Sequence, residues 1–203
     1  MKNKEKFNKA LSYIERDGIN ELVTWLEEDT DFFSAPASTK FHGNFEGGLV
    51  EHTLNAVRFG LTIFNYMVTV KPELEYLKES VILCCLFHDV CKVNCYTQEE
   101  KWTKNSQGKW TSYLGWSFKD DFPMGHGEKS VYLISKFIKL KDPEAMAIRW
   151  HMGTYEVGAN IEGLTKWSYI QASDHPLVRI VHAADLLAAT LETTIDFKAI
   201  ASK

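Results

Sequence analysis

The sequence lacks the features that direct a protein into or across a membrane. Its N-terminal stretch, MKNKEKFNKA, has no apolar segment like the centre of a secretory signal. The apolar stretches elsewhere are broken by charged or polar residues well before they reach the length of a membrane span. These absences predict a cytoplasmic protein that has no membrane partner.

An excess of positive charge is also missing. The chain has 23 Lys and Arg residues against 27 Asp and Glu residues, which gives a net charge of −4. A protein that binds long nucleic acid needs a basic track to neutralise many phosphates. The charge balance therefore argues against long nucleic acid as a partner and favours a small or short substrate.

Cysteine pairs spaced as in zinc sites are absent. The sequence has 4 cysteines, and no CxxC pair recurs along it. We therefore expect reduced and mostly buried thiols, as is usual in a reducing compartment. Cys91 and Cys95, four residues apart, leave open the alternative of a metal-binding pair.

The residues that are present predict one all-α domain. Hydrophobic residues make up 45% of the 203, which is enough for a single core. Apolar residues recur at helical spacing between glycine and proline breaks. The expected helices cover residues 5–17, 19–28, 49–68, 72–88, 127–139, 143–152 and 176–194, with a loop over 29–48.

Residues 93–118 carry a different pattern, which predicts an inserted β-hairpin. Tryptophans and tyrosines alternate with polar residues there, and the tetrapeptide Asn105–Gly108 has the composition of a turn. We expect most of these aromatic side chains to pack onto the helical bundle. The alternative is that they stack on a nucleobase.

Five histidines stand beside carboxylates or glycines in a distinctive order. Their segments are GGLVEHT (47–53), FHDVCK (87–92), GHGEKS (125–130), RWHMG (149–153) and HAADL (182–186). The doublet His88-Asp89 follows the apolar run 81–87, and Asp185 also lies among apolar residues. Burying such groups costs several kcal/mol unless they are paired or bound to metal. Imidazole together with carboxylate is a suitable ligand set for divalent transition metals.

The order His52, His88-Asp89, Asp185 resembles the signature of the HD-domain metal-dependent phosphohydrolases. GGLVEHT and LFHDVCK are similar to segments of bacterial HD-domain 3′–5′ exoribonucleases and related phage and bacterial hydrolases. The resemblance covers about residues 40–195. It implies an HD-domain helical bundle over 1–203, with N-terminal helices and a loop in 1–40 and the metal-site core in 41–195.

The resemblance also implies the metal ligands. His52, His88, Asp89 and Asp185 would bind one ion, which could be Mn, Fe, Ni, Co, Zn or Mg. His126 and His151 match the subgroup with two ions, in which Asp89 bridges them. The alternative is that these two histidines contact the substrate beside a single ion. Where the family usually has glycine in the HDxxK segment, this chain has Cys91.

Other polar residues near these motifs are candidates for catalysis and substrate binding. A metal-activated water would attack the phosphorus atom, with Asp89 holding the metal. Lys92 and Lys129 could contact phosphate as point charges. Glu128, beside His126, could act as a general base or orient a ligand. His42, in a glycine-rich loop, could approach the substrate.

These expectations lead to a phosphohydrolase that acts on a nucleotide or another small phosphorylated substrate. Phosphodiester cleavage in a short or cyclic oligonucleotide, as in a 3′–5′ exonuclease, is the alternative within the same chemistry. Two other classes remain open. One is a non-catalytic, nucleotide-binding regulatory protein, and the other is an oxygenase, because some relatives of the fold use a di-iron site.

Overall fold

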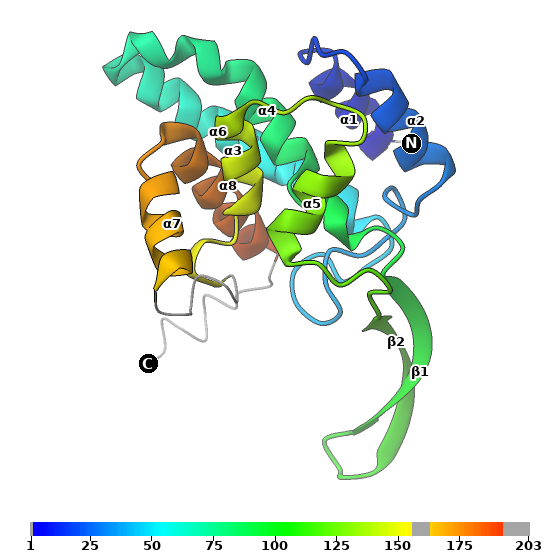
Figure 1. The fold of residues 1–203 in the computed structure, drawn as a ribbon. Coiled ribbons are helices and arrows are strands. Elements are labelled where there is room, and N and C mark those ends of the chain that lie inside the picture. The colour runs from blue at the N-terminus through cyan, green and yellow to red at the C-terminus, as the bar shows by residue number, and fades with distance from the viewer. Residues whose placement is uncertain (1, 156–162, 193–203) are drawn as a thin grey trace.

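The computed structural model describes residues 2–155 and 163–192, and it is all-helical except for one β-hairpin (Figure 1). The helices are α1 (Lys2–Leu11), α2 (Ile19–Glu28), α3 (Gly48–Val70), α4 (Lys78–Phe87), α5 (His126–Ile134), α6 (Asp142–Arg149), α7 (Leu164–Ala172) and α8 (Pro176–Glu192). Short 3-10 turns cover Pro72–Leu77, Val90–Lys92 and Gly153–Tyr155. The hairpin strands are β1 (Tyr96–Lys104) and β2 (Trp110–Phe118). The predicted fold class, all-α with an inserted hairpin, is confirmed.

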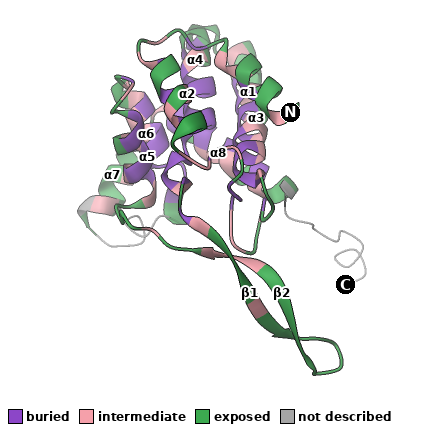
Figure 2. Ribbon diagram, turned by 90° about the vertical axis from the view of Figure 1, so that its right-hand side faces the viewer, coloured by how far each residue is buried: buried purple, intermediate pink, exposed green. Residues whose placement is uncertain are grey.

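The core is built around α4, which packs against α3, α6 and α8. Every residue of α4 from Ser80 to Phe87 is buried (Figure 2). A helix that is apolar on all sides needs neighbours on all sides, and this is why the run 81–87 shows no polar face. Gly60 of α3 lets the two helices approach closely, because a Cβ atom there would lie 2.8 Å from the sulfur of Cys85.

The N-terminal helices are attached to this core by a buried ion-pair network. The predicted helix over 5–17 ends at Leu11, where tight backbone turns follow it as far as Ile14. The guanidinium of Arg16 lies 2.9 Å from the carboxylate of Glu79 and 2.7 Å from that of Glu144, which is fully buried. Glu144 also accepts a hydrogen bond of 2.6 Å from Ser80. The network joins the start of the chain to α4 and α6.

The hairpin extends away from the bundle (Figures 1 and 2). Its antiparallel register pairs Tyr96 with Phe118 and Lys104 with Trp110. Because side chains alternate between faces, the large apolar residues all fall on one face except Tyr113. That face carries Tyr96, Trp102, Trp110, Leu114, Trp116 and Phe118. Trp102 is 61% exposed and Trp110 is 59% exposed, so the expectation that most of these aromatic side chains pack onto the bundle is wrong for the outer part of the hairpin. The outer part of the hairpin extends away from the bundle (Figure 1), so large side chains there stay exposed.

Further differences from the prediction concern the helices. Helix α7 was not predicted, because its Thr, Trp, Ser and Tyr residues have only modest helix propensity. The helix expected over 127–139 ends at Ile134, and the tight turns that follow it continue to Ile138. The predicted ends at 194 and 195 lie outside the described residues, and α8 is described to Glu192.

Across the described part of the chain, no helix combines the length and the apolar character that crossing a bilayer requires.

Candidate metal centre

The structure brings together all six residues that the sequence suggested as metal ligands. His52 comes from α3, His88 and Asp89 from the end of α4, and Asp185 from α8, whereas His126 begins α5 and His151 follows α6. Their ligand atoms form three overlapping groups, each with all its atoms within 4.8 Å of one another. The groups are His52-His88-Asp89, His88-His151-Asp185 and Asp89-His126-His151.

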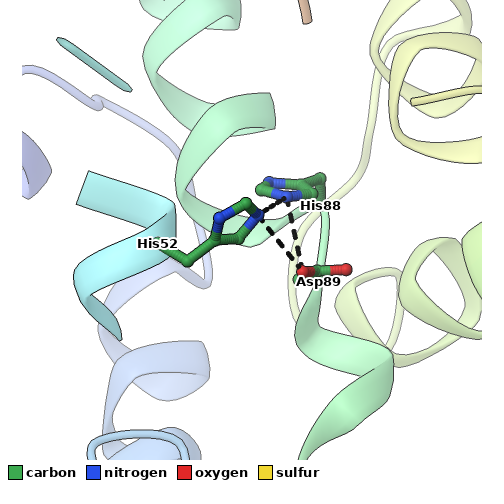
Figure 3. A group of neighbouring side chains, drawn as sticks. All are labelled: His52, His88 and Asp89. Carbon is green, nitrogen blue, oxygen red and sulfur yellow. Dashed lines mark hydrogen bonds and ion pairs between the residues drawn. The ribbon is translucent and has the colours of Figure 1, made fainter. Parts of the chain in front are cut away.

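The end of α4 allows neighbouring residues to face the same point. His88 still has helical backbone angles, with φ −55° and ψ −34°, whereas Asp89 leaves the helix with φ −102° and ψ 16°. Adjacent side chains inside a helix diverge by about 100°. The change of backbone conformation between these two residues lets both side chains turn inward (Figure 3).

The two oxygens of Asp89 face two different pairs of histidines. Oδ2 lies 3.6 Å from Nε2 of both His52 and His88. Oδ1 lies 2.9 Å from Nε2 of His126 and 3.5 Å from Nε2 of His151. The carboxylate therefore stands between two sets of nitrogen donors.

Asp185 closes the first of these two sets. Its Oδ1 lies 3.0 Å from Nε2 of His52 and 3.6 Å from Nε2 of His88. The same two nitrogens are 3.3 Å apart. Two imidazoles and two carboxylates thus point their ligand atoms at one another in a region where all but Asp185 are almost completely buried.

Backbone hydrogen bonds select the orientation of two rings. Nδ1 of His88 is 3.0 Å from the carbonyl of Cys85, and Nδ1 of His151 is 2.7 Å from the carbonyl of Ile148. A carbonyl only accepts, so Nδ1 carries the proton in both rings and the lone pair of the neutral ring lies on Nε2. Metal-binding histidines in proteins are commonly held in this way.

The donor set fits a divalent metal ion. Nε2 of His151 is buried and makes no hydrogen bond, although Asp89 is 3.5 Å away. An unsatisfied buried nitrogen costs free energy unless another group compensates it. A ligand bond from this atom would remove that cost, and mixed nitrogen and carboxylate donors suit Mn, Fe, Co, Ni or Zn.

The six candidate ligands are called the cluster below: His52, His88, Asp89, His126, His151 and Asp185. Its charged groups are arranged so that the carboxylates of Asp89 and Asp185 both stay ionised. Burial opposes ionisation of Asp89, but Lys92 and the surrounding histidines hold its pKa well below the usual range. Burial opposes ionisation of Asp185 as well, and the neighbouring imidazoles of His52 and His88 keep its pKa well below the usual range. The cluster therefore offers two negative charges.

The two remaining imidazoles have pKa values that move in opposite directions. Burial lowers the pKa of His126, and the neighbouring Asp89 only partly offsets this. Burial also acts to lower the pKa of His151, but the nearby carboxylates of Asp89 and Asp185 raise it overall. His126 thus remains a neutral donor over a wider pH range than His151 does.

Two of the suggested substrate contacts, His42 and Lys92, line a cavity at the cluster. This cavity has a volume of about 200 Å³, and Asp89, His126 and Asp185 also line it. Nζ of Lys92 is 2.7 Å from Oδ2 of Asp89, so the lysine orients this carboxylate. The ring of His42 lies 4.8 Å from that of His52, centroid to centroid.

The other two candidates, Lys129 and Glu128, have partners away from the cluster. Lys129 is buried, forms an ion pair of 2.6 Å with Asp120 and lines a neighbouring cavity. Glu128 pairs with Arg149 and lines a third cavity, one on another side of α5. This geometry gives Glu128 no contact with the cluster that would support a role as general base.

His182 is a site residue that sequence reasoning left without a role. Its ring lines the cavity at the cluster, and its Nδ1 lies 2.6 Å from the carbonyl of His151. A Cβ atom on Gly153 would lie 2.5 Å from this ring, and Gly153 has a φ of +55°, so glycine is required there. The spacing of three between His182 and Asp185 places both on one face of α8, and this signal could have identified it.

The cysteines are all free and buried. Cys91 lies in the 3-10 turn Val90–Lys92 and has a negative φ, since among the described residues Asn94 is the one non-glycine with positive φ. The backbone at Cys91 therefore does not require the glycine that is usual in similar sequences. Its sulfur is 3.3 Å from Nδ1 of His126, and burial raises the pKa of the thiol, so it stays protonated.

Comparison with known proteins gives one informative similarity. No family model matches the chain, and no solved structure matches it. The chain is 30% identical over 95 residues to a dihydroneopterin 2′,3′-cyclic phosphate phosphodiesterase of Methanocaldococcus jannaschii. The similar region covers 44% of this chain and 38% of that relative, so this chain spans well under half of the length of the relative.

Proposed function

We propose that this protein is a metal-dependent phosphoester hydrolase that acts on a small substrate. The observation that carries the proposal is the position of Asp89, whose two oxygens face two separate pairs of histidine nitrogens beside a cavity. Such a carboxylate is suited to bridge two metal ions. The similarity to a phosphodiesterase that cleaves a cyclic phosphate supports the same chemistry.

Two sets of residues would hold the metal. His52, His88, Asp89 and Asp185 would bind one ion, and Asp89 with His126 and His151 would bind a second. In such sites the metal makes a nucleophilic hydroxide available near neutral pH and neutralises charge on the phosphoryl oxygens. This resembles the arrangement of the HD-domain phosphohydrolases with two ions.

The remaining residues of the cavity would bind and orient the substrate. Lys92 is held against Asp89, and at the cavity wall its ammonium offers a fixed positive charge to a phosphoryl oxygen. His182 keeps its proton on Nδ1 through the carbonyl of His151, so Nε2 is available to accept a hydrogen bond from a substrate hydroxyl. His42 lines the same wall. Glu128 is left out of this scheme because its partner is Arg149.

The size of the site favours a small substrate, including a cyclic or short phosphodiester. The cavity at the cluster has a volume of about 200 Å³, and the neighbouring one about 440 Å³. Together with the net charge of −4, these volumes fit a mononucleotide or a cyclic phosphate better than a long strand.

A substrate screen on the purified protein tests the proposal. The protein is loaded separately with Mn, Fe, Co, Ni, Zn or Mg and incubated with mononucleotides, 2′,3′-cyclic and 3′,5′-cyclic nucleotides, short oligonucleotides and long RNA. We expect turnover of a small phosphoester and its loss in Asp185→Asn. The matched control is Asp174→Asn, because Asp174 has a 79% exposed side chain on the same chain segment.

Three outcomes would contradict the proposal. Efficient degradation of long single strands, without turnover of any small substrate, would favour the exonuclease alternative. Nucleotide binding without turnover under any metal would favour a regulatory protein. Oxygen consumption by the iron-loaded protein in the presence of an organic substrate would favour an oxygenase.

A further inference from the structure

A second cavity begins at the cluster of candidate metal ligands and extends toward the base of the hairpin. It has a volume of about 440 Å³ and shares Lys92 and His126 with the cavity at the cluster. Binding sites for small organic molecules usually have volumes of about 300–1,000 Å³ and combine apolar walls with a few placed polar groups. A ligand in this cavity would have one end beside the cluster and the other beside the hairpin.

The wall at the hairpin end is aromatic. Tyr96 and Phe118, the first cross-strand pair of the hairpin, pack edge to face with ring centroids 5.2 Å apart. The hydroxyl of Tyr96 donates a hydrogen bond of 3.2 Å to the carbonyl of Ala37, which holds this ring in place. Phe118 remains 53% exposed, and Met124 completes an apolar rim. The half-exposed ring of Phe118 thus offers a surface that a flat group could cover.

Among the described residues that line the same cavity, one carries a carboxylate, Asp120. Oδ1 of Asp120 accepts hydrogen bonds from Nζ of Lys129 at 2.6 Å and from the backbone N–H of Phe122 at 2.9 Å. Partial burial opposes ionisation, but the hydrogen bond from Lys129 keeps the pKa of Asp120 below its usual value. Asp120 is therefore an ionised acceptor next to an aromatic wall. That combination matches the N–H donors at the edge of a heterocyclic ring.

We propose that this cavity is a subsite for a flat heterocycle with N–H donors, such as a guanine-like or pterin-like ring, carried by the alcohol part of the phosphoester. The ring stacks on Phe118 beside Tyr96 and donates to Asp120, and the phosphoester lies between Lys92 and His126. The inference rests on the proposed function, because it assigns the substrate class of that site. In this proposal the substrate contacts aromatic side chains only at the base of the hairpin.

The competing arrangement is a longer track along the hairpin. Trp102 lies on the same face as Phe118 but nearer the turn, and it does not line the cavity. A single-stranded nucleic acid would use both residues, whereas a single heterocycle would use only Phe118. Glu100 lies on this face beside Trp102, opposite Leu114, and a carboxylate there opposes a phosphate backbone. The observations therefore favour the single heterocycle.

Kinetics on a matched pair of substrates test the subsite. Guanosine 2′,3′-cyclic phosphate and ribose 2′,3′-cyclic phosphate differ only in the base. Stacking of one base on an aromatic side chain accounts for about 5- to 150-fold in affinity. We expect KM to be lower by this factor for the guanosine compound, with a similar kcat. Phe118→Ala should remove the part of the difference that stacking contributes, and Phe118→Tyr, which keeps the ring, should retain it.

Two further variants make the test specific to this cavity. Trp102→Ala should leave the KM values for the guanosine and ribose compounds unchanged. Asp120→Asn should raise KM for guanosine 2′,3′-cyclic phosphate more than for adenosine 2′,3′-cyclic phosphate, because adenine lacks the ring N–H of guanine. Equal KM values for the base-bearing and base-free compounds would overturn the proposal. An equal effect of Trp102→Ala and Phe118→Ala would also overturn it, in favour of a strand track.

A binding measurement separates this inference from the proposed function. Guanosine itself has no phosphate, so its binding to the full chain by calorimetry does not depend on hydrolysis. Binding that weakens in Phe118→Ala but not in Trp102→Ala would support the subsite even if no phosphoester were turned over. Binding that is absent, or unchanged in Phe118→Ala, would refute it even if the enzyme were active. Circular dichroism on each variant checks that the fold is retained.

Discussion

Metal binding should stabilise the whole fold, because the proposed ligands come from segments far apart in the sequence. His52, His88-Asp89, His151 and Asp185 lie on or beside four different helices. The unfolded chain does not assemble these groups, so the metal binds the native state in strong preference. Removing the metal with a chelator is therefore a perturbation of folding stability as well as of activity.

The size of the effect follows from mass action. A ligand present at 100 times its Kd stabilises the native state by about 2.7 kcal/mol. In a chain of 203 residues, 1 kcal/mol shifts the melting temperature by about 2–4 °C. Saturation with the preferred metal should therefore raise the melting temperature by about 5–11 °C over the chelated protein. The shift should continue to grow with the logarithm of the metal concentration.

Thermal denaturation followed by circular dichroism measures this shift for each metal in turn. Asp185→Asn removes one of the two negative charges that face the imidazoles of His52 and His88, so most of the shift should disappear. Asp174→Asn, on the exposed surface, should keep it. An identical shift in the wild type and Asp185→Asn would refute the reasoning, because it would show that the metal acts elsewhere on the protein.

Other changes test the scaffold and the individual assignments. Arg16→Met should cost about 3–5 kcal/mol in urea denaturation at neutral pH, because it leaves the buried carboxylate of Glu144 without its cation. Burial opposes ionisation of Glu79, but Arg16 lowers its pKa overall, so the ionised carboxylate stabilises the fold at a pH above its unfolded pKa. The loss of unfolding free energy in Arg16→Met should therefore become smaller as the pH falls below about 4. His126→Ala should reduce the bound metal from two ions toward one in elemental analysis, and an unchanged stoichiometry would place this histidine among the substrate contacts. Glu128→Gln should keep kcat within about threefold, since one general base contributes about 100-fold or more, and a loss of that size would restore the general-base role.

Several features of the protein follow from the sequence because their cause is local. The helix over 19–28 and the hairpin were predicted close to their observed bounds, since spacing and turn residues decide them. The apolar run 81–87 identified a buried helix. The doublet His88-Asp89 at its end is buried as well, and burial of such groups demands partners. The identity of six candidate ligands came from motifs, and their role as ligands stays a prediction.

Tertiary structure alone decided which groups meet. The sequence places Glu128 two residues from His126, yet the side chain of Glu128 reaches Arg149 and that of His126 reaches Asp89. His182 had no assigned role, and packing placed its ring in the cavity at the cluster. The hairpin aromatics were expected on the bundle, and the direction of the hairpin leaves Trp102 exposed. Local sequence specifies backbone conformation and which groups need partners, whereas the partner is chosen by the packing of helices that are distant in the chain.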